Sequence, residues 1–208
     1  MEKIDKYRIL NEDVIKGQIL FTGSSLMEQF PINELLMTDH SDKIVYNRGV
    51  GGFLTDDMLQ FVEEQIFGVE PAKIFINIGT NDIADVTKTF EECLKKMLGN
   101  YENILTQIKE RLPETEVYLM AYYPVNELDK IPEGDWGKTA FLNRNNKNIA
   151  IANEAVKKLA ERMNYHYIDV NNGLTDERGM LKYDYTVEGI HMYANAYRVI
   201  YNNIKEYL

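Results

Sequence analysis

The sequence predicts an α/β domain in which a five-stranded parallel sheet is covered by helices on both faces. Five short runs rich in β-branched and aromatic residues recur along the 208 residues, and helical periodicity or turn residues separate each run from the next. This alternation favours a parallel sheet with helices on both sides. With 45% hydrophobic residues the chain can bury one sizeable core, so we expect a single domain over residues 1–208.

The expected strands cover residues 18–22, 44–47, 73–78, 116–122 and 165–170. Helices are expected where apolar residues recur every three or four positions, over residues 90–112, 149–163 and 193–208. In this order the elements predict a flavodoxin-like three-layer α/β/α sandwich. Ligands of such sheets bind beyond the carboxyl ends of the strands, so candidate functional residues are sought there.

One long irregular segment, residues 123–142, holds two of the five prolines and the only tryptophan. Loops of this length in compact domains tend to be lids or binding loops. Core packing and a substrate wall are both open for the aromatic residues in and beside it, which are Tyr122, Tyr123, Trp136 and Phe141. Trp136, between two glycines, is the best candidate for a mobile lid contact.

Composition excludes several classes of function. The formal net charge of −10 gives little support for binding nucleic acid or anionic membrane surfaces. No run approaches the ~18 apolar residues of a membrane span, and the N-terminal residues lack an apolar signal core. Cys93 is the only cysteine, so no internal disulfide can form. We expect it to be a free thiol on the buried side of a helix. We therefore expect a soluble, cytoplasmic protein in a reducing compartment.

Four short pieces fall at expected strand ends or on the loop before the last helix. They are Gly23-Ser24-Ser25-Leu26, the stretch 47–52 (NRGVGG), Gly79-Thr80-Asn81-Asp82 and Glu188-Gly189-Ile190-His191. In a doubly wound sheet all four converge on one edge, although Ser25 and His191 are far apart in the sequence. The sequence thus predicts one site assembled by the fold.

In this order, the four pieces resemble the sequence blocks of the GDSL esterases, also called SGNH hydrolases, over nearly the whole chain. The resemblance implies that Ser25 is the nucleophile and that His191 is the general base. It also implies an oxyanion hole made by the backbone N–H groups of Ser25 and Gly52, with Gly51 a near alternative for the latter, and by the Asn81 amide. No metal or organic cofactor is implied.

The chemistry explains these residue types. A serine hydroxyl becomes a good nucleophile only when a neighbouring imidazole takes its proton, and each oxyanion donor is typically worth ~3–4 kcal/mol. A glycine at position 52 keeps a side chain from blocking the close approach of backbone to ligand.

Two positions depart from the family pattern. Ser24 stands where the family has aspartate, which we interpret as a local change in turn hydrogen bonds. Glu188 stands where the family has the aspartate that orients the histidine, a task that glutamate performs in other Ser-His-acid enzymes. We expect Ser25, His191 and Glu188 to form a catalytic triad. If Glu188 points away, Asp184 or a backbone carbonyl would orient His191.

Other polar residues receive structural interpretations. His40 lies in a polar stretch and His166 inside the fifth strand, neither with metal-ligand spacing. Asp82 is expected to cap the following helix, and Asp169 to close the fifth strand.

The resemblance implies a serine esterase or acylhydrolase that cleaves carboxylic esters through an acyl-serine intermediate. The family that the chain resembles includes enzymes for several classes of substrate. We expect short acyl esters, such as acetyl esters, of a sugar or another small polar alcohol, because the small domain lacks a recognisable lipid-binding insertion. The alternatives are a lysophospholipase or thioesterase acting on longer acyl chains, and a non-catalytic binding module on the same fold. The sequence leaves the oligomeric state open.

Overall fold

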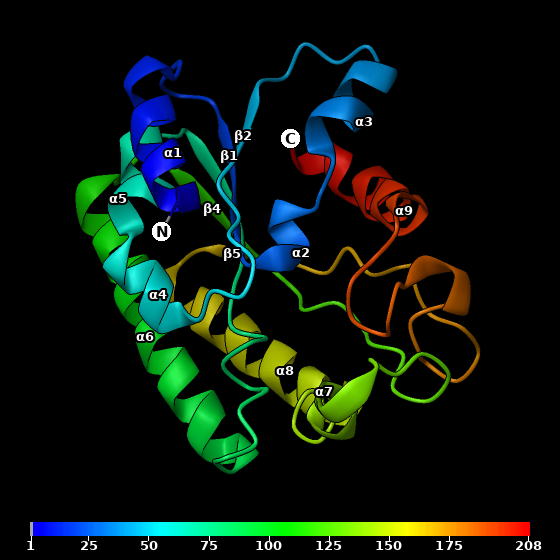
Figure 1. Ribbon diagram of the computed structural model, residues 1–208. Helices are drawn as coiled ribbons and strands as arrows, with labels where there is room; N and C mark the ends of the chain where they lie inside the picture. The colour runs from blue at the N-terminus through cyan, green and yellow to red at the C-terminus, as the bar shows by residue number, and fades with distance from the viewer. Residues whose placement is uncertain (1) are drawn as a thin grey trace.

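The computed structural model describes residues 2–208 and shows a parallel sheet between two layers of helices (Figure 1). Its strands lie in the order β2-β1-β3-β4-β5, and each neighbouring pair runs parallel. They are β1 (Ile19–Gly23), β2 (Val45–Asn47), β3 (Lys73–Asn77), β4 (Glu116–Met120) and β5 (His166–Ile168). The predicted α/β class and parallel sheet are confirmed, although β5 is shorter than the predicted 165–170.

Long and short helices alternate with these strands. The predicted long helices correspond to α6 (Phe90–Arg111), α8 (Asn146–Met163) and α9 (Ala194–Ile204), the last followed by a single 3₁₀ turn at Lys205–Tyr207. The remaining α-helices are α1 (Glu2–Leu10), α2 (Ser25–Glu28), α3 (Ile32–Thr38), α4 (Thr55–Gln60), α5 (Val62–Gln65) and α7 (Gly134–Thr139).

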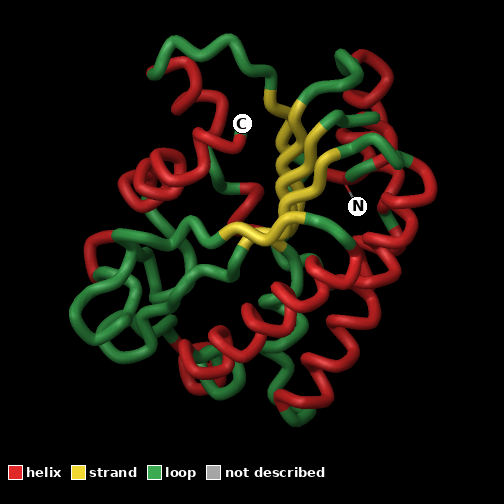
Figure 2. Tube along the Cα trace, turned by 180° about the vertical axis from the view of Figure 1, so that it is seen from behind, coloured by secondary structure: helices red, strands yellow, loops and turns green. Residues whose placement is uncertain are grey.

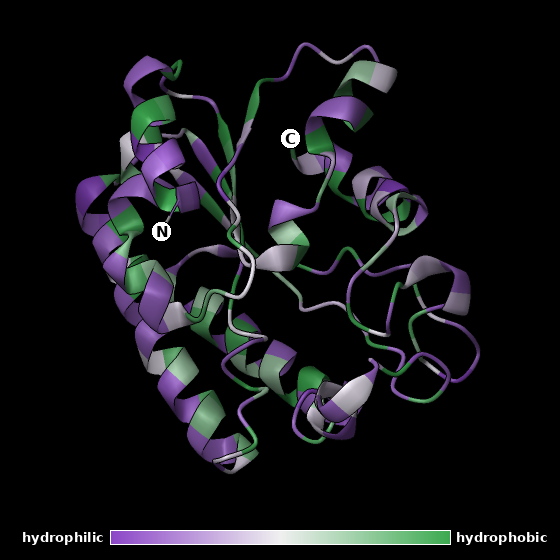
Figure 3. Ribbon diagram, viewed as in Figure 1, coloured by the Kyte–Doolittle hydropathy of each residue, from purple (hydrophilic) through white to green (hydrophobic). Residues whose placement is uncertain are grey.

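The two faces of the sheet are buried by different helices because alternate side chains of a strand point to opposite sides. Leu20, Ile74 and Val117 pack against the layer formed by α4, α5, α6 and α8. Phe21 and Phe75 pack against the layer that contains α2, α3 and α9. The view from behind shows the strands enclosed between these layers (Figure 2), and the outward faces of the helices are mainly hydrophilic (Figure 3).

The N-terminal helix α1 was not among the expected elements. It buries only Ile4 and Tyr7, which pack against Val50 in the loop after β2, and the Tyr7 hydroxyl donates to the Gly49 carbonyl at 2.8 Å. Helix α1 therefore rests on the loop that supplies one of the predicted functional glycines.

The long segment 123–142 is only partly irregular, because α7 lies within it. Tyr123 at its start is 2% exposed and belongs to the core, as does the neighbouring Tyr122. No helix among residues 2–208 is long and apolar enough to cross a membrane.

Candidate active site

Ser25 lies at a tight turn where β1 passes into α2. Gly23 has φ +152°, and a Cβ at this position would lie 2.0 Å from the Asn77 carbonyl oxygen at the end of β3. A glycine is therefore required for the ends of β1 and β3 to approach each other. The turn places Ser25 at the first position of α2, beyond the carboxyl edge of the sheet.

The loop before α9 brings an imidazole and a carboxylate to this serine. His191 Nε2 lies 3.0 Å from Ser25 Oγ, and His191 Nδ1 lies 2.5 Å from Glu188 Oε1. Because an ionised carboxylate only accepts hydrogen bonds, Nδ1 carries the proton, and Nε2 can accept the serine hydroxyl. The structure thus joins Ser25, His191 and Glu188 in one hydrogen-bonded chain.

The environment of Glu188 favours its ionised form. Burial raises the pKa of the Glu188 carboxyl, but the hydrogen bonds and the charge of His191 outweigh this and leave the pKa below its ordinary value. The loop that carries Glu188 and His191 is tight: the Thr186 hydroxyl accepts from the Gly189 N–H and donates to the His191 carbonyl, both at 2.8 Å. Asp184, the predicted substitute, is exposed and makes no side-chain hydrogen bond to His191.

Backbone and amide donors face Ser25 from two neighbouring loops. Asn81 Nδ2 donates to the Phe53 carbonyl at 3.0 Å, which leaves its second N–H for the cavity. Within residues 2–208, the N–H groups of Ser25 and Gly52 have no hydrogen-bond acceptor. Gly52 has φ +81°, and a Cβ there would meet open space, so its left-handed backbone is what favours glycine.

The alternative donor Gly51 is already engaged. Its N–H donates to Glu28 Oε2 at 2.5 Å, and Glu28 also pairs with Lys3 of α1. Of the two glycines, Gly52 therefore has the N–H free to meet a ligand.

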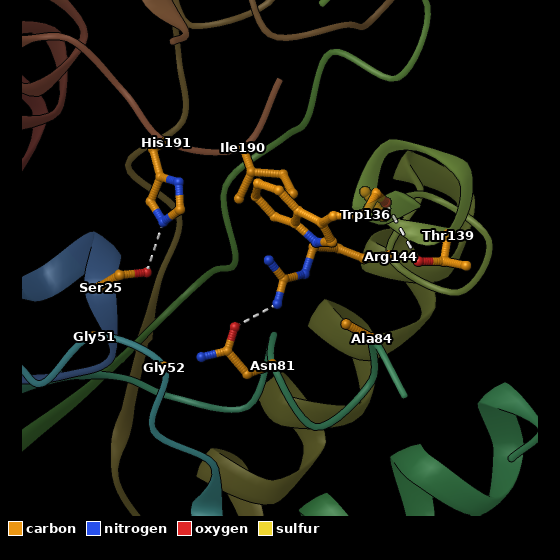
Figure 4. A pocket seen from close by; sticks show the side chains of 11 residues that line it. Ser25, Gly51, Gly52, Asn81, Ala84, Trp136, Thr139, Arg144, Ile190 and His191 are labelled. Atoms are coloured by element: carbon orange, nitrogen blue, oxygen red, sulfur yellow. Dashed lines mark hydrogen bonds between the residues drawn. The ribbon is translucent and has the colours of Figure 1, made fainter. Parts of the chain in front are cut away.

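These groups line one cavity of about 450 Å³ (Figure 4). Its wall combines polar groups with a few apolar side chains, among them the half-exposed Trp136 of α7. The complete lining is Ser25, Gly51, Gly52, Asn81, Ala84, Trp136, Thr139, Ala140, Arg144, Ile190 and His191. Of the four aromatic residues weighed as a substrate wall, only Trp136 lies on this cavity.

The structure corrects the expectation for Asp82. The carboxylate accepts from the backbone N–H and the hydroxyl of Thr55, at the start of α4, whereas the helix that follows in the chain, α6, is capped by Thr89. The prediction was wrong because the partner of Asp82 precedes it in the sequence by 27 residues. Asp169 behaves as expected and accepts from the Asn171 N–H just after β5.

The other histidines have no role in the cavity. His166 stacks on Tyr118 with a ring-centroid distance of 4.7 Å, and His40 is exposed in the loop after α3. No group of His, Cys, Asp and Glu side chains suited to a metal ion occurs in the part of the chain that the structure describes. Two polar residues near the cavity, Glu28 and Arg144, escaped the sequence analysis because neither belongs to a recognisable motif.

Comparison with known proteins agrees with this geometry. The model of the GDSL-like Lipase/Acylhydrolase family matches residues 28–199, which include the predicted glycine, asparagine and histidine positions. The match begins three residues after Ser25. The interpretation of Ser25 as the nucleophile therefore rests on the geometry described above and not on the family match.

Solved structures and a curated relative extend the comparison. A Streptococcus pneumonia structure described as a candidate platelet activating factor is 33% identical, with a TM-score of 0.85 and coverage of 99% of this chain and 91% of that one. An acetylxylan esterase from Geobacillus stearothermophilus, 16% identical, shares the fold with a TM-score of 0.66 and coverage of 92% and 95%.

The curated relative is the N-acylneuraminate cytidylyltransferase of Escherichia coli O18:K1:H7 (strain RS218 / NMEC), 25% identical over 215 residues. The match covers 99% of this chain, which spans only 45% of that relative. The family match over most of the chain leads to one conclusion: this chain belongs to the GDSL-like lipase/acylhydrolase family.

Proposed function

We propose that Ser25, His191 and Glu188 form a catalytic triad that hydrolyses short acyl esters, such as acetyl esters, of a sugar or another small polar alcohol. The observation that carries this proposal is the 3.0 Å contact between Ser25 Oγ and His191 Nε2 on the wall of a cavity that also holds Gly52 and Asn81. Nucleophile, base and oxyanion donors are thereby available to a single bound ester.

The first half of the reaction forms the acyl-enzyme. Ser25 Oγ attacks the ester carbonyl carbon while His191 Nε2 takes the hydroxyl proton, and the ionised Glu188 stabilises the resulting imidazolium. The N–H groups of Ser25 and Gly52 and the Asn81 amide donate to the negative oxygen of the tetrahedral intermediate. The intermediate then expels the alcohol, which receives its proton from His191.

The second half releases the acid. His191 takes a proton from water, whose oxygen attacks the acyl carbon, and the second tetrahedral intermediate uses the same three donors. Its collapse breaks the bond to Ser25 Oγ and returns the proton from His191 to the serine. The cycle needs no group from outside the chain except substrate and water.

The cavity wall supports a small polar substrate. Beside the nucleophile it presents an imidazole, an amide and a guanidinium, with apolar surface supplied by Trp136, Ile190 and two alanines. Polar groups of this kind fix the orientation of a small ligand through a few hydrogen bonds.

A longer acyl chain is the second candidate. Three large apolar side chains on the segment around α7 are exposed, Leu128 by 58%, Ile131 by 53% and Leu142 by 61%. None of the three lines the cavity, so a long acyl chain would have to extend beyond the cavity to reach them.

Hydrolysis of p-nitrophenyl esters from acetyl to dodecanoyl tests this choice. The proposal predicts the highest kcat/KM for acetyl and loss of turnover in Ser25→Ala. A maximum at long chains would favour the lysophospholipase or thioesterase alternative. Absence of turnover on every ester, together with no labelling by a fluorophosphonate, would point to the binding module.

A further inference from the structure

Arg144 is a buried cation beside the predicted oxyanion donors. It precedes α8, its exposure is 7%, and it lines the cavity. None of the carboxylates described in residues 2–208 forms an ion pair with it. Instead its Nε and Nη2 donate to the Thr80 carbonyl at 2.9 and 2.7 Å, and Nη2 also donates to Asn81 Oδ1 at 2.5 Å. Figure 4 shows the guanidinium pointing at the Asn81 amide.

These contacts determine which way the Asn81 amide faces. The guanidinium only donates and the Phe53 carbonyl only accepts, so Oδ1 must face Arg144 and Nδ2 must face Phe53. Turning the amide over would set its NH₂ group against the guanidinium and its oxygen against a carbonyl. Both bonds would be lost, and the cavity would face an amide oxygen that repels a developing oxyanion.

The positive charge of Arg144 also strengthens Asn81 as a hydrogen-bond donor. Burial lowers the pKa of the guanidinium to about 10, which still leaves it protonated at neutral pH. A cation bonded to the amide oxygen polarises the amide and makes its N–H groups better donors.

We propose that Arg144 is a positioning residue for the oxyanion, acting through Asn81, which it holds with an N–H presented to the ester oxygen. This inference rests on the proposed acyl-serine chemistry at Ser25. Because oxyanion stabilisation operates in the transition state, the effect belongs mainly to kcat and only weakly to KM.

The planar fork of arginine suits this task better than lysine does. Two guanidinium nitrogens bond the Thr80 carbonyl while one of them also reaches Asn81 Oδ1. An ammonium on a flexible stem provides the charge without that geometry. Arg144→Lys therefore retains the charge but loses the fixed amide orientation.

The experiment compares kcat and KM for p-nitrophenyl acetate in Arg144→Lys, Arg144→Ala and Asn81→Ala and in both double variants. We expect each Arg144 substitution to lower kcat about 10- to 100-fold while KM changes less than about threefold. In the Asn81→Ala background the same substitutions should lower kcat by less than about threefold, because the group through which Arg144 acts is absent. Added guanidinium ion should restore part of kcat in Arg144→Ala and none in Asn81→Ala.

Controls separate this effect from a general loss of structure. Lys138→Met removes an exposed cation of α7 whose one ion-pair partner among the described residues is Asp135, and it should leave kcat unchanged. Thermal unfolding of every variant shows whether it is folded at the assay temperature. If Arg144→Ala fails to fold, the comparison of Arg144→Lys with and without Asn81 still tests the coupling.

The inference is overturned if the Arg144 substitutions lower kcat equally with and without Asn81, or if they leave kcat unchanged. A raised KM at constant kcat would also overturn it and would make Arg144 a substrate-binding residue. A wild-type protein that neither turns over esters nor reacts with a fluorophosphonate would refute the proposed function itself, which is a distinct result.

Discussion

At the scale of single residues, Glu188 is the most informative position of the chain. Its carboxylate meets His191 Nδ1 at 2.5 Å despite being one methylene longer than the family's aspartate. In the same loop, the Thr186 hydroxyl bonds the Gly189 N–H and the His191 carbonyl. This contact supports our proposal that glutamate orients His191 where the family pattern has aspartate.

Replacing Glu188 with glutamine tests this role. The amide keeps the size of the side chain, but it cannot stabilise an imidazolium by charge, and it can hold the ring in the wrong tautomer. We expect kcat for p-nitrophenyl acetate to fall about 10²- to 10⁴-fold. Asp184→Asn is the matched control, since Asp184 is exposed and its carboxylate makes no hydrogen bond to His191, and it should retain the wild-type rate. A wild-type rate in Glu188→Gln would instead leave a Ser-His pair as the catalytic unit.

The sequence predicted these residues only where they belong to motifs. Ser25, Asn81 and His191 follow from their blocks, and the structure brings them to one cavity. Arg144 could not be predicted, because its partners are a carbonyl 64 residues earlier and a side-chain amide 63 residues earlier in the chain. Nothing in the local sequence marks such a contact.

At the scale of elements, the loop that carries His191 is fixed by close backbone packing. Gly189 has φ +95°, and its carbonyl accepts from the Asn126 N–H at 2.8 Å. A Cβ on Gly189 would lie 2.2 Å from the Lys130 carbonyl oxygen. The segment before α7 therefore holds the loop in place.

Gly189→Ala should disturb both stability and catalysis. The added methyl group must displace the 126–130 backbone, so we expect the free energy of unfolding to fall by about 1–3 kcal/mol and kcat to fall with it as His191 shifts. Gly179→Ala is the matched control, because Gly179 has φ +78° but open space around its missing Cβ. Urea unfolding and esterase assays should show a smaller loss of stability and unchanged kcat for the control. Equal effects in both variants would contradict the role of the close packing.

Element prediction succeeded where the pattern is long or strongly apolar. The strands and the helices α6, α8 and α9 were found from β-rich runs and from repeated apolar positions. Helices α2, α4 and α5 have only four to six residues, and α1 buries only two, so their patterns carry little signal. Asp82 was assigned to the wrong helix for a related reason, since a cap supplied from a distant loop has no sequence signature.

At the scale of the whole molecule, the N-terminal helix and the nucleophile turn support the same loop. Tyr7 of α1 bonds the Gly49 carbonyl, and Glu28 of α2 accepts from the Gly51 N–H. Lys3 pairs with Glu28 and links the two supports. Helices α1 and α2 thereby fix the loop after β2 that presents the Gly52 N–H to the cavity.

Glu28→Ala removes the acceptor for the Gly51 N–H and should loosen this loop. We expect kcat for p-nitrophenyl acetate to fall about tenfold with a small change in KM, because a misplaced Gly52 N–H weakens oxyanion stabilisation. Lys3→Ala removes only a partly exposed ion pair and should lower stability by at most about 1 kcal/mol with kcat intact. If Glu28→Ala changes only KM or only the stability and leaves kcat at the wild-type value, the loop is not part of the oxyanion hole.

The most direct test of the central claim is peptide mapping by mass spectrometry after reaction with a fluorophosphonate. An activated serine becomes phosphonylated, whereas an ordinary serine does not react. The account predicts a single adduct on Ser25 in the wild type and no adduct in Ser25→Ala. An unmodified Ser25, or an adduct on another residue that persists in Ser25→Ala, would contradict it.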